Sequence, residues 1–294
     1  MNADQSRPPA AGTPVGTFTL QELEGYWGDV HRQIAREQSP GAAIVEANPR
    51  LVNLFDDFGH RLGMRANLRR LGRLDGRRVL DLGCGRGRWV AEFAARGAQV
   101  TGVDWCVEAL EQARRRVPQA GFARMPINDL GFSDGSFDVV NSVTVVQHLP
   151  HDVQVRAIRE AARVLAPGGM LSLIELTAMQ PGPHVFPRRV EGWVALAREH
   201  GFEPAGVRGC CYELVFRPYK AAVARLRAQN GNRPSNGNGL AGVGSKHGLT
   251  WRQRANRLAM TALALPAFPV ELLSLVLPAG TATHAAMVFR RARD

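Results

Sequence analysis

Between residues 78 and 176, short apolar runs alternate with longer stretches in which apolar residues recur every three or four positions. The short runs, bounded by charge or glycine, predict strands at 78–82, 99–103, 121–125, 137–142 and 170–176. The longer stretches predict helices between them. Alternating strands and helices predict βαβ units, and hence a parallel sheet with helices on both faces.

Individual residues define the expected positions of three of the helices. Apolar positions at Val107, Leu110 and Ala113 predict a helix that Pro118 ends. Asp152 is expected to cap the next helix, in which Ile158, Ala161, Ala162 and Leu165 would face inward. Beyond the fifth strand, residues 188–200 predict a helix and 204–210 a further strand.

The chain outside this region divides into several expected parts. Residues 1–17 predict a disordered tail and 18–77 an N-terminal helical cap, before a core over 78–210. An insertion is expected over 211–283. It contains a glycine- and asparagine-rich flexible linker at 229–245 and an apolar helical segment at 258–280. Residues 284–294 are expected to supply the last strand of the core.

Composition narrows the class of protein. The 294 residues carry a formal net charge of +11, but the basic residues are almost all scattered arginines, which favours a codon bias over a nucleic-acid footprint. The four cysteines show neither C-x-x-C nor a His/Cys metal spacing, so we expect no metal site. Reduced thiols and a polar N-terminus without a secretory signal favour a cytoplasmic protein.

A glycine-rich turn, VLDLGCGRGRW at 79–89, directly follows the first predicted strand. Its three glycines at 83–87 let the backbone turn sharply and let a ligand approach closely. Asp104, at the end of the second strand, is positioned to accept bonds from both hydroxyls of a ribose. Because position 88 is arginine, the dinucleotide spacing G-x-G-x-x-G is absent. Asp81 instead offers a carboxylate to a cationic amino-acid group.

The chain resembles the class I S-adenosylmethionine-dependent methyltransferases, in the small-molecule, methyltransferase type 11-like group. The resemblance rests on VLDLGCGRG (79–87), VTGVD (100–104), LGFSDGSFDVV (130–140) and REAARVLAPGGML (159–171). It covers 78–176 closely, and 200–208 and 284–291 loosely. It implies S-adenosylmethionine as cofactor and an α/β fold: a Rossmann-like, mostly parallel seven-stranded sheet with an antiparallel last strand.

The resemblance also implies roles for individual cofactor-binding residues. The methionine part would lie against Asp81, Gly83, Cys84, Gly85 and Gly87, Asp104 would bind the ribose, Trp105 would stack on the adenine, and the backbone of Ile127 would contact the adenine edge. The chain departs from many relatives, which carry an acid where Met125 and Pro126 stand. Asn128 or Asp129 is then the substitute for that acid.

Candidate catalytic residues follow the fourth and fifth strands. His148 either acts on the acceptor or packs beneath the cofactor, and Glu175 either orients a substrate or bonds loop amides. His184, between the prolines of PGPHVFP, is either a general base for a hydroxyl acceptor or a cap on the pocket. The pair Tyr26-Trp27 either folds over the cofactor, as in many relatives, or belongs to the core.

We therefore expect methyl transfer to a small-molecule acceptor, such as a sugar or another secondary metabolite. One alternative is an RNA or DNA methyltransferase. Residues 141–144 read Asn-Ser-Val-Thr, which matches neither the Pro-Pro-aromatic motif of base-amino methylases nor the cysteine of cytosine C5 enzymes. A second alternative is a non-catalytic cofactor-binding protein on the same fold.

The apolar segment 258–280 leaves a further choice open. It either completes the core beside the last strand, covers an apolar acceptor, or contacts a membrane surface. Its three prolines and Glu271 disfavour a helix that spans a membrane.

Overall fold

A computed structural model describes residues 20–36, 50–178, 184–212 and 277–293, together with positions 214, 218, 251, 254–255, 258–259, 261–262, 269 and 272. The expected tail at 1–17 and linker at 229–245 lie outside these residues, as does most of the apolar segment 258–280. None of the helices within the described residues has the length and apolar character required to cross a membrane.

The centre of the fold is a seven-stranded sheet with the order β3-β2-β1-β4-β5-β7-β6. Its strands are β1 Arg78–Leu82, β2 Gln99–Asp104, β3 Gly121–Arg124, β4 Phe137–Val143, β5 Leu165–Leu176, β6 Phe202–Cys210 and β7 His284–Arg291. The first five are parallel, whereas β7 runs antiparallel to both β5 and β6. The expected Rossmann-like sheet with an antiparallel last strand is confirmed.

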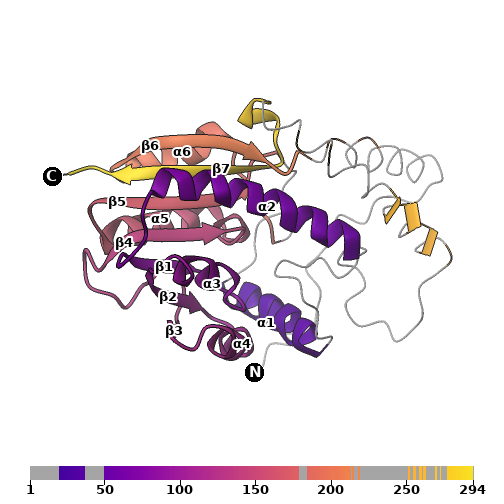
Figure 1. The fold of residues 1–294 in the computed structure, drawn as a ribbon, viewed down its shortest axis with the longest axis horizontal. Coiled ribbons are helices and arrows are strands. Elements are labelled where there is room, and N and C mark those ends of the chain that lie inside the picture. The colour runs from indigo at the N-terminus through magenta and orange to yellow at the C-terminus, as the bar shows by residue number, and fades with distance from the viewer. Residues whose placement is uncertain are drawn as a thin grey trace, which may run out of the picture.

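Helices cover both faces of the sheet (Figure 1). They are α1 Leu20–Arg36, α2 Arg50–Leu71, α3 Arg88–Ala94, α4 Val107–Arg116, α5 His151–Val164 and α6 Val190–Glu199, with short 3-10 turns η1 Val146–His148 and η3 Ala279–Thr281. In the view of Figure 1, α2 crosses in front of the sheet and α5 and α6 lie behind it.

The two apolar layers follow from the alternation of side chains along each strand. Val79 of β1 packs with Met64 and Val90 on the face covered by α2 and α3. The next residue, Leu80, packs with Ile158 and Trp193 on the face covered by α5 and α6. A strand buried on both faces is mostly apolar, which explains the nearly continuous apolar runs in the sequence.

Two local expectations were wrong. Helix α5 begins at His151 after Pro150, whose ring cannot cap it, and the side chain of Asp152 instead accepts a bond from Arg156. Leu165 lies in β5 because the helix ends one residue earlier and Leu165 pairs with Phe137. By contrast, the helix expected from Val107, Leu110 and Ala113 is confirmed as α4.

Candidate active site

The three loop glycines all adopt the left-handed conformation, with φ values of 60°, 50° and 73° at Gly83, Gly85 and Gly87. A Cβ atom at Gly83 would lie 2.5 Å from the Val145 side chain, and one at Gly87 would lie 3.1 Å from that of Ala113. At Gly85, the nearest atom within the described chain would be His31 Cε1, at 3.7 Å. Gly83 and Gly87 therefore allow close internal packing, whereas a Cβ atom at Gly85 would make only an ordinary van der Waals contact with His31.

Asp104 ties this loop to the end of β2. Its Oδ2 accepts a hydrogen bond from the Gly85 amide, and its Oδ1 accepts one from the Cys106 amide, both at 2.9 Å. Each carboxylate oxygen can accept a second bond, so two charged acceptor sites remain beside the loop. The side chain is nearly buried, and a further hydrogen bond to it would therefore be poorly screened by water.

Asp81 is a buried carboxylate with one oxygen unsatisfied. The Asn141 side chain donates to Asp81 Oδ1 at 2.7 Å, whereas Oδ2 has no hydrogen-bond partner among the described residues. Burial raises the pKa of Asp81 to about 7, the negative charge of Asp104 acts in the same direction, and the Asn141 bond opposes both. A buried acceptor without a donor is costly, so this oxygen is suited to a cationic partner.

Trp105 and Ile127 lie at the same edge of the sheet. Trp105 follows Asp104 directly, and its carbonyl accepts a bond from Arg124 at 2.9 Å. Its ring packs against the apolar cluster that contains Ile127. Cys84 is buried inside the loop, and its burial raises the pKa of the thiol well above the usual range. Cys84 therefore remains a small neutral side chain.

Glu175 is fully buried at the end of β5 and accepts four hydrogen bonds. The Ser142 hydroxyl donates at 2.9 Å, and the amides of Val145, Val146 and Gln147 donate at 3.4, 3.2 and 3.1 Å. Burial raises the pKa of Glu175 to about 7, against the effect of these donors. Of the two roles considered for Glu175, the hydrogen bonds correspond to the anchoring of loop amides, here those of η1.

His148, at the end of η1, has both ring nitrogens engaged. Because a carbonyl oxygen only accepts, Nδ1 must donate to the backbone oxygen of His184 at 2.8 Å. Nε2 is then the acceptor nitrogen, and it lies 3.3 Å from the side-chain nitrogen of Gln147. Burial lowers the pKa of His148 to about 4, so the ring is neutral at physiological pH.

His184 lies against aromatic side chains of α1. Its ring stacks on Tyr26 with the centroids 4.4 Å apart, and its Nε2 lies 3.4 Å from the Tyr26 hydroxyl. Trp27 packs edge-on against His148 at 4.5 Å. Burial lowers the pKa of His184 and raises that of Tyr26 to about 12. The structure therefore brings together the aromatic pair and both candidate histidines, which lie far apart in the sequence.

Helix α1 lies beside α4 at the edge of the sheet that carries the glycine loop (Figure 1). Ion pairs join Arg32 to Glu108 at 3.3 Å and Glu24 to Arg124 at 2.7 Å. The helix also brings His31 over Gly85, a contact that the sequence did not predict. His31 follows Trp27 by one helical turn, and that spacing was the available signal.

Comparison with known proteins agrees with this geometry. The family model described as a methyltransferase domain matches residues 79–169. The ubiquinone biosynthesis O-methyltransferase of Bordetella bronchiseptica is 30% identical over 177 residues, which cover 52% of this chain and 73% of that enzyme. The chain belongs to the class I S-adenosylmethionine-dependent methyltransferases.

One further relative and one solved structure resemble this chain over longer stretches. Methyltransferase GfsG of Streptomyces halstedii is 34% identical over 193 residues, or 63% of this chain and 62% of that protein. The crystal structure of the [4+2]-cyclase SpnF superposes with a TM-score of 0.58 at 18% identity, covering 94% of this chain and 97% of that one. At this identity the superposition shows the shared fold alone.

A methyltransferase of this family uses S-adenosylmethionine as its cofactor. The S-adenosylmethionine-bound magnesium protoporphyrin IX methyltransferase of Synechocystis PCC 6803 has the same fold, with a TM-score of 0.52 and 20% identity over 64% of this chain and 88% of that one. The glycine loop and Asp104 lie within the residues that match the family model.

Proposed function

We propose that this methyltransferase transfers a methyl group to a hydroxyl oxygen of a small-molecule acceptor, and that His184 is the general base. The observation that carries the proposal is the His184 imidazole, held against Tyr26 near the edge of the sheet where β4 and β5 end. The O-methyltransferase relatives support an oxygen acceptor.

The cofactor site in this proposal follows from the fit of the residues to S-adenosylmethionine. The unsatisfied oxygen of Asp81 takes the amino group of the methionine part, which Gly83, Cys84, Gly85 and Gly87 allow to approach the backbone. Asp104 accepts bonds from the ribose, Trp105 stacks on the adenine and the Ile127 backbone contacts its edge. When bound, the cofactor supplies a methyl group that is activated by a positively charged sulfur.

His184 is better suited than His148 to remove a proton. A lowered pKa keeps the His184 ring neutral, and therefore able to accept a proton, at physiological pH. In this role Nε2–H donates to the oxygen of the Tyr26 hydroxyl, which orients the imidazole and leaves Nδ1 as the nitrogen that accepts the proton. Both ring nitrogens of His148 are already engaged by Gln147 and by the His184 carbonyl, and its pKa of about 4 lies well below neutrality.

In this account Glu175 and His148 are positioning residues. Glu175 fixes the start of η1 by accepting bonds from the amides of Val145, Val146 and Gln147, and η1 carries His148. His148 then holds the carbonyl of His184, and the Gln147 carbonyl holds the Phe186 amide at 2.7 Å. The loop that carries the base is therefore attached at His184 and again at Phe186, which reduces its freedom before the acceptor binds.

The acceptor in our proposal is a hydroxyl-bearing secondary metabolite, such as a polyketide, a quinol or a sugar. Its binding region is lined by Tyr26 and Trp27, whose faces suit a partly apolar ring. We further propose that residues 211–283, between β6 and β7, cover the acceptor.

The experiment is a mass-spectrometric screen of purified enzyme with S-adenosylmethionine and candidate metabolites, followed by NMR of each product. We expect the mass of one methyl group to be gained as a methyl ether. Methyl groups found only on nitrogen or carbon would contradict the oxygen acceptor. Cofactor binding without methylation of small molecules, but with methylation of RNA or DNA, would contradict the acceptor class.

A further inference from the structure

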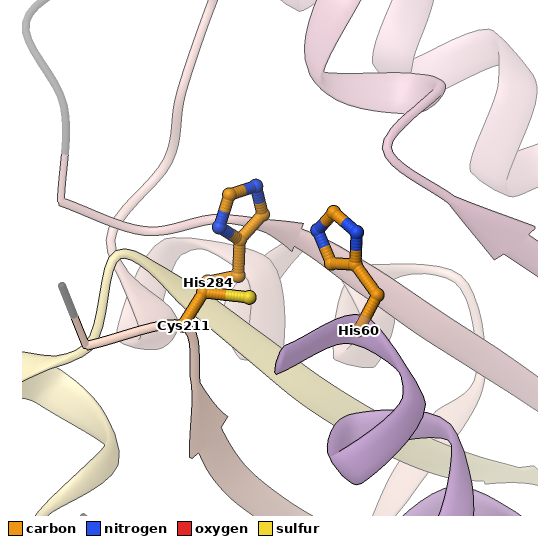
Figure 2. Close-up of side chains that lie close together, drawn as sticks. All are labelled: His60, Cys211 and His284. Atoms are coloured by element: carbon orange, nitrogen blue, oxygen red, sulfur yellow. The ribbon is translucent and has the colours of Figure 1, made fainter. Parts of the chain in front are cut away.

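Three potential metal ligands converge beside the sheet from distant parts of the chain (Figure 2). His60 lies on α2, Cys211 directly follows β6 and His284 is the first residue of β7. One ligand atom from each residue lies within 4.8 Å of the other two. The spacing in the sequence does not predict this cluster, because only the folded chain brings the three residues together.

His60 supplies an independent reason to expect a ligand. Its side chain is 4% exposed, and neither of its ring nitrogens has a hydrogen-bond partner within the described part of the chain. Buried polar side chains nearly always have a partner, so an imidazole with two unsatisfied nitrogens requires an explanation. A metal ion bound to one nitrogen provides it.

The backbone around Cys211 holds its thiol beside His60. The pairing of β6 with β7 aligns Cys210 with His284, and the carbonyl of Cys211 accepts a bond from the Thr283 amide at 3.1 Å. A Cβ atom at position 59 would lie 2.5 Å from Cys211 Sγ, so Gly59 makes room for the sulfur next to His60. Cys211 adopts a φ of 54°, which non-glycine residues rarely do.

We propose that His60, Cys211 and His284 bind a Zn²⁺ ion, with a water molecule as the fourth ligand. Two imidazoles and one thiolate form a donor set that zinc prefers, and three protein ligands leave one position open. Ligand atoms of a tetrahedral zinc site lie about 3.3–3.6 Å apart, from bond lengths of about 2.0–2.3 Å. Small side-chain rotations close the observed cluster to that size. The thiol proton leaves to solvent when the metal binds.

The ion would connect α2 to the carboxyl end of β5. His284 pairs with Leu176, the residue after Glu175, so the cluster lies at the same end of that strand as the anchor of η1. The proposed metal site thus lies near the candidate catalytic residues His148, Glu175 and His184 but includes none of them.

The test uses the full chain, stripped of metal with a chelator and titrated with Zn²⁺ or Co²⁺. We expect one zinc per chain by elemental mass spectrometry. Cobalt should give the visible bands of a tetrahedral site and a near-ultraviolet thiolate-to-cobalt band. Loss of a hydrogen-bond partner of a ligand costs about 10- to 100-fold in metal affinity, so Cys211→Ser or His60→Gln should cost at least about 100-fold.

Matched controls separate the cluster from other histidines and thiols. Cys210→Ser changes the neighbouring buried cysteine, and His200→Gln changes a histidine that caps the C-terminal end of α6; both should retain wild-type zinc affinity. Zinc affinity that is unchanged in Cys211→Ser would overturn the proposal. So would a wild-type cobalt spectrum without the thiolate band, a result that does not depend on how any variant folds.

Discussion

The amide of Gly85 donates to Asp104 Oδ2 over 2.9 Å, so the glycine loop after β1 and the acid at the end of β2 form one unit. The bond fixes the backbone of the loop at Gly85. Together with the bond from the Cys106 amide, it also fixes the Asp104 carboxylate. A substitution of Gly85 or of Asp104 should therefore also displace the other residue and so alter cofactor binding.

Asp104→Ala should weaken S-adenosylmethionine binding by about 10- to 150-fold, because a charge-assisted hydrogen bond contributes about 1.5–3 kcal/mol. Isothermal titration calorimetry measures this directly. Asp152→Ala, an exposed acid on α5 that pairs with Arg156, is the control and should bind normally. Unchanged affinity in Asp104→Ala would mean that the ribose lies elsewhere.

Gly83→Ala and Gly85→Ala make the same change at similar φ but in different surroundings. The added methyl at Gly83 meets Val145 at 2.5 Å, so this variant should lose an additional 1–3 kcal/mol or so of unfolding free energy, as overpacked sites do. Denaturant unfolding compares the two. Equal stability of both variants would argue against the close packing at Gly83.

Gly85→Val should lower cofactor affinity more than Asp104→Ala does, because a branched side chain at Gly85 would block the close approach of the cofactor to the loop backbone. Calorimetric titration of both variants with S-adenosylmethionine in the same buffer shows which variant binds the cofactor more weakly. A Gly85→Val protein that folds and binds S-adenosylmethionine as tightly as the wild type would place the cofactor away from this loop.

Cofactor affinity should depend on the ionisation of Asp81. With a pKa of about 7, Asp81 is largely protonated at pH 5.5 and ionised at pH 8, and only the ionised form pairs with the cationic amino group. Affinity should therefore fall as the pH decreases below 7. In Asp81→Asn it should be weak and nearly independent of pH over that range. A wild-type affinity that is constant from pH 5.5 to 7 would contradict the pairing.

The same shift affects stability with a defined sign. A folded-state pKa above the unfolded value means that Asp81 favours the folded state at low pH, and this contribution is lost as the pH rises toward 7. The ligand-free wild type should therefore lose more thermal stability than Asp81→Asn between pH 4.5 and 7.5. Parallel melting curves would contradict this assignment.

His184→Ala should lower the turnover rate by about 10²- to 10⁴-fold, the usual range for loss of a general base, while cofactor affinity stays within a factor of about two. Because burial lowers the pKa of His184, wild-type activity should fall as the pH drops through that value below about 6.5. The variant should lack this acidic limb. His200→Ala is the control, and near-normal turnover in His184→Ala would remove the residue from the mechanism.

Glu175→Gln tests the positioning of the base. The amide weakens the bonds to η1, so turnover should fall in the wild-type background with little change in the KM for S-adenosylmethionine. If Glu175 acts through His184, the same change should have almost no effect on the residual turnover of His184→Ala. Equal losses in both backgrounds would indicate a role independent of the base.

Features that depend on neighbouring residues could be predicted from the sequence. The apolar runs predicted the parallel strands, and the glycines between β1 and α3 predicted a tight turn that faces Asp104. Both follow from backbone geometry over a few positions. The start of α5 was predicted at Asp152 because the sequence pattern alone does not distinguish a capping acid from one that pairs with Arg156.

Contacts between distant segments could not be predicted in this way. The stacking of Tyr26 on His184 requires α1, whose Leu23 and Val30 are buried, to lie beside α4. The Asn141 bond to Asp81 depends on the register of β1 against β4. The convergence of His60 with Cys211 depends on how α2 crosses the end of β6.

The most direct test of the account uses S-adenosylmethionine with a deuterated methyl group and a panel of hydroxyl-bearing metabolites. The account predicts that wild-type enzyme transfers the label to an acceptor oxygen, with stoichiometric release of S-adenosylhomocysteine, and that His184→Ala does so at least about 100-fold more slowly. Label on nitrogen or carbon, or equal rates for the two proteins, would contradict it.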